Sequence, residues 1–186
     1  MKVTDVMIDL ETMGTRTDAP IIAIGAVGID LEAMEVTDRT FYTQISLSSA
    51  VKSGAKIDPS TVLWWLRQSD AARAAFHDND KAPGLLAALT DFTTWFMQWG
   101  DVPTWGNGAT FDNVLLAEAF KGFGMKTPWS YRNDRCFRTL RALYPEVQAP
   151  FGAGTAHNAL DDAAYQAKHL VEIMRVVNGK QARAAA

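Results

Sequence analysis

Two apolar segments near the N-terminus limit most strongly what this chain can fold into. Residues 3–11 (VTDVMIDLE) are apolar enough to form a buried first strand, and residues 21–29 (IIAIGAVGI) form a second. Residues 40–47 (TFYTQISL) alternate in character and predict a third strand, with the polar stretch 30–38 as the turn before it. The order predicts a meander of three strands.

Helical patterns dominate the rest of the chain. Five helices are expected: one begins after Asp58, one has Pro83 as its first residue, Thr110 and Asp134 cap two more, and the last has an apolar stripe from Leu160 to Met174. Residues 102–106 (VPTWG) are a short candidate strand, and the loop at 149–155 is a candidate mobile segment. The pattern indicates an α/β domain with a mixed sheet.

We expect one domain over residues 1–179, because Gly179 is the predicted end of the last helix and residues 180–186 form a flexible tail. With 48% hydrophobic residues, the chain can form a real core. It has no run of the ~18 apolar residues that a membrane span needs. The single cysteine, Cys136, suits a reducing cytoplasm. The net charge of −3 argues against a generally basic surface for nucleic acid.

Two acidic residues stand near the end of the first predicted strand. Side chains alternate along a strand, so Asp9 and Glu11 point to one face, about 7 Å apart. A divalent cation would remove their repulsion and use their oxygens as ligands. A strand end that emerges into solvent would also accept two acids, so the pair alone does not decide between these readings.

Two later motifs are equally weak in isolation. Asp112 follows Asn107 in a glycine-bearing turn and falls in the first turn of a predicted helix, where any acid complements the helix dipole. His157 lies near the start of the last helix, with Asp162 about a turn and a half further on and Asp161 beside it. A histidine and acids at such positions are common without any chemistry.

Together the motifs predict a metal site, because each acid lies where a strand or helix end aims it at one crevice beside a sheet. Four carboxylates carry more charge than one dication neutralises, which points to two Mg²⁺ or Mn²⁺ ions. Two such ions about 3.5–4 Å apart suit in-line attack on a phosphodiester. Zinc is disfavoured, because Cys136 is remote from these motifs and no histidine pair has ligand spacing.

The ordered set Asp-x-Glu, Asn-x₄-Asp and His-x₄-Asp resembles the DEDDh (DnaQ-like) 3′→5′ exonuclease superfamily. The resemblance is closer to the exodeoxyribonuclease VIII-like and 3′→5′ exoribonuclease-like domains of phages and bacteria. It covers the chain from Asp5 to about Leu170 and is carried by MIDLETMGTRTDAPIIAIGAV, WWLRQSD, WGNGATFDNVLL, NDRCFRTL and GTAHNALDDAAYQA.

The resemblance implies an RNase H-like fold with a mixed five-stranded sheet flanked by helices. It implies metal ligands at Asp9, Glu11, Asp112 and Asp162, and a general base at His157. The family spacing from His157 selects Asp162 rather than Asp161. The resemblance also allows a homodimer, and it suggests a phage or prophage gene whose product acts in the host cytoplasm.

The substrate side is predicted from neighbouring residues. Thr12 and Met13 follow the metal strand, where a hydroxyl could bind the 3′ end and a thioether could wedge against a base. Of two adjacent tryptophans, one could stack on a base while the other joins the core; for each one singly the core is the favoured interpretation, and the sequence does not say which is which. A local excess of basic residues favours phosphate binding. The remaining candidate contacts are Trp64, Trp65, Asn107 and, among the basic residues, Arg135.

The sequence therefore predicts an enzyme that removes nucleoside 5′-monophosphates from single-stranded 3′ ends, with RNA slightly favoured over DNA. One alternative is a noncatalytic nucleic-acid or nucleotide-binding module on the same scaffold, which would bind without turnover. Such a module would be expected to lack one of the four acids or the histidine, and this chain has all five. A purely structural protein with acids on its surface is the third reading, and five motif segments in family order argue against it.

Overall fold

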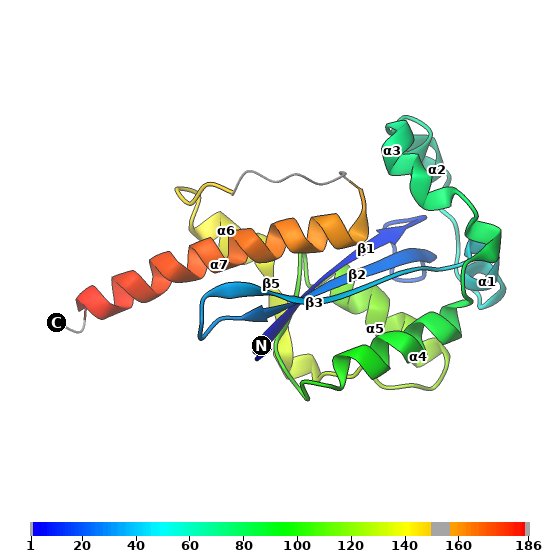
Figure 1. Cartoon of the computed structure of the whole chain (residues 1–186). Helices are drawn as coiled ribbons and strands as arrows, with labels where there is room; N and C mark the ends of the chain where they lie inside the picture. Colours follow the sequence, from blue (N-terminus) through cyan, green and yellow to red (C-terminus); the bar gives the residue numbers. More distant parts are fainter. Residues whose placement is uncertain (1, 150–156, 185–186) are drawn as a thin grey trace.

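The computed structural model describes residues 2–149 and 157–184, and Figure 1 shows the arrangement of its elements. Their order is β1 (Asp5–Thr12), β2 (Ile21–Asp30), β3 (Glu35–Gln44), α1 (Leu47–Lys52), α2 (Pro59–Trp65), α3 (Asp70–Arg73), η1 (Ala74–Phe76), η2 (Asn79–Lys81), α4 (Leu85–Phe96), β4 (Thr104–Gly106), α5 (Asp112–Gly122), η3 (Tyr131–Asn133), β5 (Asp134–Cys136), α6 (Phe137–Leu143) and α7 (Ala159–Ala184). The predicted loop at 149–155 falls outside the described residues except for Ala149.

The five strands form one mixed sheet in the order β3-β2-β1-β4-β5. The first three strands pair antiparallel as the predicted meander, whereas β1 pairs parallel with β4 and β4 with β5. This confirms the expected mixed five-stranded sheet flanked by helices. Because β1 is the central strand, side chains at its carboxyl end can be reached by elements from both faces.

Alternation along β1 divides the core into two layers. Ile8 and Leu10 face a cluster built with α4 and α5, whereas Met7 faces a cluster built with α6 and α7. In Figure 1, α7 lies on one side of the sheet and α4 and α5 lie on the other. Asp9 and Glu11 share the face of Met7, so the two acids point toward the side that α7 covers.

Three predicted boundaries differ from the structure. Helix α4 begins at Leu85 with Gly84 as its N-cap, so Pro83 is not its first residue, and the other two concern the third strand and Thr110. The third strand begins at Glu35, because Asp30 accepts hydrogen bonds from the backbone N–H groups of Glu32 and Ala33 and confines the turn to four residues. Thr110 does not cap a helix: the N-cap of α5 is Phe111, and its backbone N–H donates to the Gly108 carbonyl in a tight turn. Helix α5 therefore starts at the acid itself.

Two more corrections concern Asp134 and the end of the last helix. Asp134 is not the N-cap of a helix, because α6 has Cys136 as its N-cap. The carboxylate of Asp134 accepts hydrogen bonds from Asn113 and Trp129, and the residue opens β5, a strand the local pattern did not reveal. The last helix does not end at Gly179 but continues to Ala184. Good helix formers follow Gly179, and one glycine in a helix interior costs only about 1 kcal/mol.

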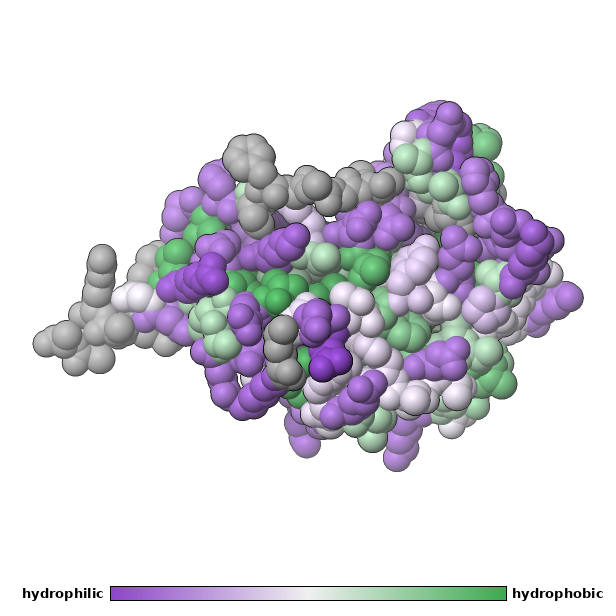
Figure 2. All heavy atoms as spheres, in the orientation of Figure 1, coloured by the Kyte–Doolittle hydropathy of each residue, from purple (hydrophilic) through white to green (hydrophobic). Residues whose placement is uncertain are grey.

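None of the helices in the described part of the chain is long and apolar enough to cross a bilayer. Figure 2 shows hydrophilic side chains spread over the visible face and hydrophobic ones gathered where α7 lies on the sheet.

Candidate active site

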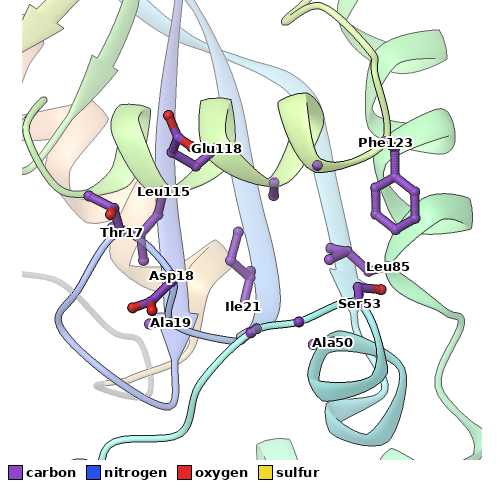
Figure 3. Close-up of a pocket in the computed structure, with 14 residues that line it drawn as sticks. Thr17, Asp18, Ala19, Ile21, Ala50, Ser53, Leu85, Leu115, Glu118 and Phe123 are labelled. Atoms are coloured by element: carbon purple, nitrogen blue, oxygen red, sulfur yellow. The ribbon is translucent and has the colours of Figure 1, made fainter.

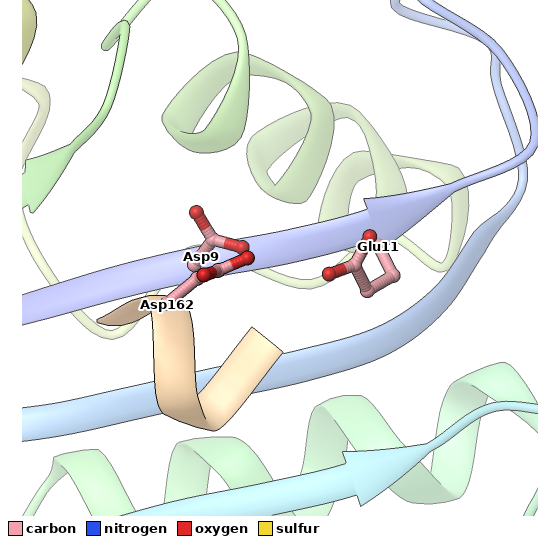
Figure 4. Close-up of side chains that lie close together, drawn as sticks. All are labelled: Asp9, Glu11 and Asp162. Carbon is pink, nitrogen blue, oxygen red and sulfur yellow. The ribbon is translucent and has the colours of Figure 1, made fainter. Parts of the chain in front are cut away.

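Three carboxylates from the two ends of the sequence meet above the carboxyl end of β1. Asp9 and Glu11 come from β1 and Asp162 from the first turn of α7, as Figure 4 shows. One oxygen from each lies within 4.8 Å of the others. The sequence predicted this convergence, including the choice of Asp162 rather than Asp161. Oxygen ligands at this spacing suit a divalent cation such as Mg²⁺ or Mn²⁺.

A glycine on the neighbouring strand lets α7 come this close. Gly25 of β2 is paired with Asp9, and a Cβ atom built on it would lie 2.2 Å from the backbone carbonyl of Ala159. The first turn of α7 therefore rests directly on the sheet backbone beside Asp9. Asn158 caps this helix, because its side-chain oxygen accepts the N–H groups of Leu160 and Asp161.

Asp112, the fourth acid, approaches from the opposite side of β1. It is the first residue of α5 and is 3% exposed. Gly106 of β4 makes the approach feasible, because a Cβ there would lie 3.0 Å from Cβ of Asp112 and 2.4 Å from Oδ1 of Asn113. Backbone N–H groups of Asp112, Leu10 and Asn107 bind its carboxylate and partly offset the effect of burial, which raises its pKa to about 7.

The cluster is electrostatically strained when it holds no cation. Burial, followed by repulsion from Asp112, raises the pKa of Asp9 well above its usual range, and a hydrogen bond from Gln166 opposes the rise. Burial and the charges of Asp162 and Asp112 raise the pKa of Glu11 to about 8. Burial also raises the pKa of Asp162. Buried acids that repel one another at a crevice mark a functional site, and a bound cation would return them to the charged form.

This strain predicts a pH dependence of the metal-free protein. In EDTA, its stability is expected to fall as the pH rises from about 4.5 to about 8, because the folded protein retains the Glu11 proton that the unfolded chain has already released. Glu11→Gln removes the charge, so we expect its melting temperature near pH 8 to exceed that of the wild type by several degrees and its pH slope to be flatter.

Calorimetry in EDTA near pH 5 and near pH 8 measures both effects. Glu118→Gln is the matched control, since Glu118 is partly exposed and paired with Lys121. Wild-type protein that becomes more stable over this interval, or a Glu11→Gln variant that melts below wild type near pH 8, would contradict the account of the cluster.

His157, the predicted general base, lies beside the cluster. Its backbone N–H donates to Oδ2 of Asp162 at 3.0 Å, and its φ of 66° turns the chain into α7. The imidazole packs edge-on against Trp64, with ring centroids 4.8 Å apart. Because this hydrogen bond holds the backbone of His157 against Asp162, the imidazole starts from a position next to the carboxylates.

The two adjacent tryptophans differ in burial, so that one belongs to the core and the other is open to solvent. Trp65 is 3% exposed and donates its indole N–H to the Thr12 carbonyl, whereas Trp64 is 41% exposed. Trp64 lines an open groove of about 510 Å³ whose wall also includes Glu11, Ser60 and Arg67. The groove leads to the carboxylates, so Trp64 is the tryptophan available to a base.

Two other residues predicted to contact the substrate, Thr12 and Met13, already contact other residues of the protein. The Thr12 hydroxyl donates to the Gly14 carbonyl at 2.7 Å. Met13 is 6% exposed and packs with Ile22 and Trp65. The structure therefore places Thr12 at the groove, whereas Met13 is a core residue outside its lining.

Of the two arginines Arg135 and Arg138, it is Arg138 whose charge acts on an acid of the site. Arg138 donates to the Asn107 carbonyl at 2.7 Å, and its charge lowers the pKa of Asp112. Arg135 donates to backbone carbonyls at Arg132 and Asp134, and its charge acts on Asp5, at the far end of β1. The sequence analysis favoured Arg135, because the sequence did not reveal β5, the strand that leads directly into α6 and Arg138.

Gln166 is the contact that the sequence interpretation missed. Its side-chain N–H donates to Oδ1 of Asp9 at 2.7 Å. The available signal was its spacing, because Gln166 follows Asp162 by four residues and therefore shares its face of the helix. A polar residue next to Ala163 and Ala167 on an otherwise apolar stripe marks a buried polar contact.

A second pocket, of about 200 Å³, lies on the face of the sheet opposite the cluster (Figure 3). Its wall combines the β1–β2 loop, α1 and α5 with mostly small side chains. The two carboxylates there, Asp18 and Glu118, pair with Lys56 and Lys121. Nothing in this pocket resembles the strained acids of the cluster.

Comparisons with known proteins agree with this geometry. A curated exodeoxyribonuclease of Enterobacteria phage T4 is 26% identical over 86% of this chain and 84% of its own. Among solved structures, an E. coli ExoI complex with single-stranded DNA has a TM-score of 0.68 at 17% identity, covering 94% of this chain and 41% of that one. Exonuclease X in complex with 5′-overhanging duplex DNA has a TM-score of 0.58 at 19% identity and covers 92% of both chains.

The structural neighbours share the RNase H-like fold of DEDDh exonucleases. The sequence model of one family, described as the 3′-5′ exoribonuclease Rv2179c-like domain, matches residues 4–174, which is nearly the whole chain. The protein therefore belongs to the Rv2179c-like 3′→5′ exoribonuclease domain family.

Proposed function

We propose that this protein is a two-metal-ion-dependent 3′→5′ exonuclease that hydrolyses single-stranded 3′ ends and releases nucleoside 5′-monophosphates, with RNA slightly favoured over DNA. The observation that carries the proposal is the cluster of Asp9, Glu11 and Asp162, whose oxygens lie within 4.8 Å of one another, with buried Asp112 beside them. We place its action in the cytoplasm, that of the host if it is phage-encoded, because the T4 relative is a phage protein.

The donor set fits the proposed cations. Asp9, Glu11, Asp112 and Asp162 offer only hard oxygen ligands. A dication that binds them would displace the protons that their raised pKa values favour and would relieve the repulsion between their charged forms. When bound, Mg²⁺ or Mn²⁺ ions would lower the pKa of an attacking water and neutralise charge at the leaving 3′-oxygen.

The remaining steps belong to the protein. His157 would take a proton from the attacking water at an imidazole nitrogen, a role matched to neutral pH. Trp64 would support the terminal base in the groove. Arg138, held at the Asn107 carbonyl beside Asp112, would attract a backbone phosphate.

The proposed preference for RNA rests on the description of the family. The family description names RNA and the T4 relative acts, by its name, on DNA. Both sugars are compatible with the same hydrolysis, because only contacts to the 2′-hydroxyl distinguish them.

The test uses 5′-labelled RNA and DNA strands of one sequence, linear with free or blocked 3′ ends and circular, in Mn²⁺. We expect unblocked strands to shorten stepwise, with nucleoside 5′-monophosphates identified by mass spectrometry and RNA consumed faster. Cleavage of circular or blocked strands would overturn the exonuclease proposal, and tight binding without cleavage would favour the binding module. Faster loss of DNA would overturn only the sugar preference.

A further inference from the structure

The side chain of Gln166 is a buried amide whose nitrogen donates a hydrogen bond and whose oxygen accepts none from the described residues. It is 6% exposed, and its Nε2 donates to Oδ1 of Asp9 at 2.7 Å. Its Oε1 is buried and has no hydrogen-bond partner among the described residues. An unpaired buried acceptor destabilises a fold, so its presence at a functional site calls for a reason.

A purely structural reason is weak. A hydrogen bond from α7 to β1 would help to hold the helix on the sheet, but α7 is already packed there through fully buried Ala163, Ala167 and Leu170. An amide that gains one hydrogen bond and leaves its other polar atom buried without a partner adds little net stability. An apolar side chain of the same shape would pack as well.

The chemistry of the site supplies a better reason. A carboxylate ligand must be ionised and held in one orientation, and donors from neighbouring residues provide both in metal centres. The N–H of Gln166 binds one oxygen of Asp9 and fixes the plane of its carboxylate. The unpaired Oε1 belongs to the same amide group, next to Asp9, where water molecules around a bound cation would bring hydrogen-bond donors.

We propose that Gln166 is a positioning residue of the metal centre, whose N–H holds Asp9 as a ligand and whose Oε1 accepts a hydrogen bond from the hydration shell of the bound cation. The proposal rests on the proposed function, because it presumes that the cluster binds divalent cations. Helix α7 thus carries Asp162 as a ligand and, one turn later, the residue that orients Asp9.

The test is Gln166→Met, which keeps the length of the side chain and removes both polar atoms. Two properties are measured without nucleic acid: the Kd for Mn²⁺ by calorimetric titration and the melting temperature in EDTA. We expect the Kd to weaken about tenfold or more, with a melting temperature equal to or above that of the wild type, because the unpaired oxygen is gone. Turnover is expected to fall at limiting Mn²⁺ and to recover largely at saturating Mn²⁺.

His169→Leu is the matched control. His169 lies on the same helix, is 4% exposed, and its ring Nε2 is 3.0 Å from the Val147 carbonyl, away from the acids. We expect this variant to melt at a lower temperature and to keep the wild-type Kd for Mn²⁺. Gln166→Asn, which is one methylene shorter, is expected to weaken Mn²⁺ binding as Gln166→Met does and covers the case in which that variant folds poorly.

A wild-type Kd for Mn²⁺ in both Gln166 variants would overturn the inference. If the melting temperature also fell as in His169→Leu, Gln166 would be a purely structural contact between α7 and β1. Wild-type protein that binds no Mn²⁺ would instead overturn the proposed function itself.

Discussion

Asp162→Asn is expected to lower exonuclease turnover about a thousandfold, whereas Asp161→Asn should stay within about threefold of wild type. The loss corresponds to about 4 kcal/mol of transition-state stabilisation, the scale expected when a ligand that holds a catalytic cation loses its charge. Asp162 belongs to the carboxylate cluster and also accepts the backbone N–H of His157, so the change affects both the metal site and the position of the base.

The comparison is sharp because the two aspartates are adjacent on one helix turn and the substitution is identical. Single-turnover assays at saturating Mn²⁺ give the rate, and melting temperatures show that both variants are folded. Equal losses for the two variants would mean that the cluster, as drawn in Figure 4, is not the reactive site.

Gly25→Ala is expected to have the second-largest effect, although position 25 carries no chemistry. The new Cβ would lie 2.2 Å from the Ala159 carbonyl and 2.4 Å from the Leu160 nitrogen, so the first turn of α7 must move away from β2. We expect a loss of about 3 kcal/mol in unfolding free energy from overpacking. Displacement of Asp162 from Asp9 should lower turnover about a hundredfold in the protein that remains folded.

Gly179→Ala provides the control on the same helix. A Cβ at Gly179 meets nothing within 4 Å, so alanine there should stabilise the protein by about 0.5–1 kcal/mol and leave turnover unchanged. Denaturant titration and the nuclease assay measure both variants. Wild-type turnover in Gly25→Ala would show that the close approach of α7 is not required for the site.

Much of the site could be predicted because the alternation of side chains along a strand and the spacing between the acids can be read from the sequence alone. The alternation of β1 places Asp9 and Glu11 on one face, and the family spacing selects Asp162. What local patterns could not give are contacts between distant segments. Asp134 looked like a helix cap because its partner Asn113 lies on α5, 21 residues earlier in the chain.

The same limit explains the substrate side. Arg135 and Arg138 look alike in sequence, and only the parallel pairing of β5 with β4 separates the one that acts on Asp5 from the one beside Asp112. The exposure of Trp64 and the burial of Trp65 depend on how α2 packs, which a pair of adjacent residues does not reveal. Contacts of this kind need the tertiary structure.

The most direct test of the central claim follows the loss of full-length single-stranded RNA in EDTA and after Mn²⁺ is added back, for wild type and Asp9→Ala. We predict no degradation in EDTA, full recovery with Mn²⁺ for the wild type, and none for Asp9→Ala. Degradation that survives EDTA or the loss of Asp9 would contradict a metal-dependent reaction at this cluster.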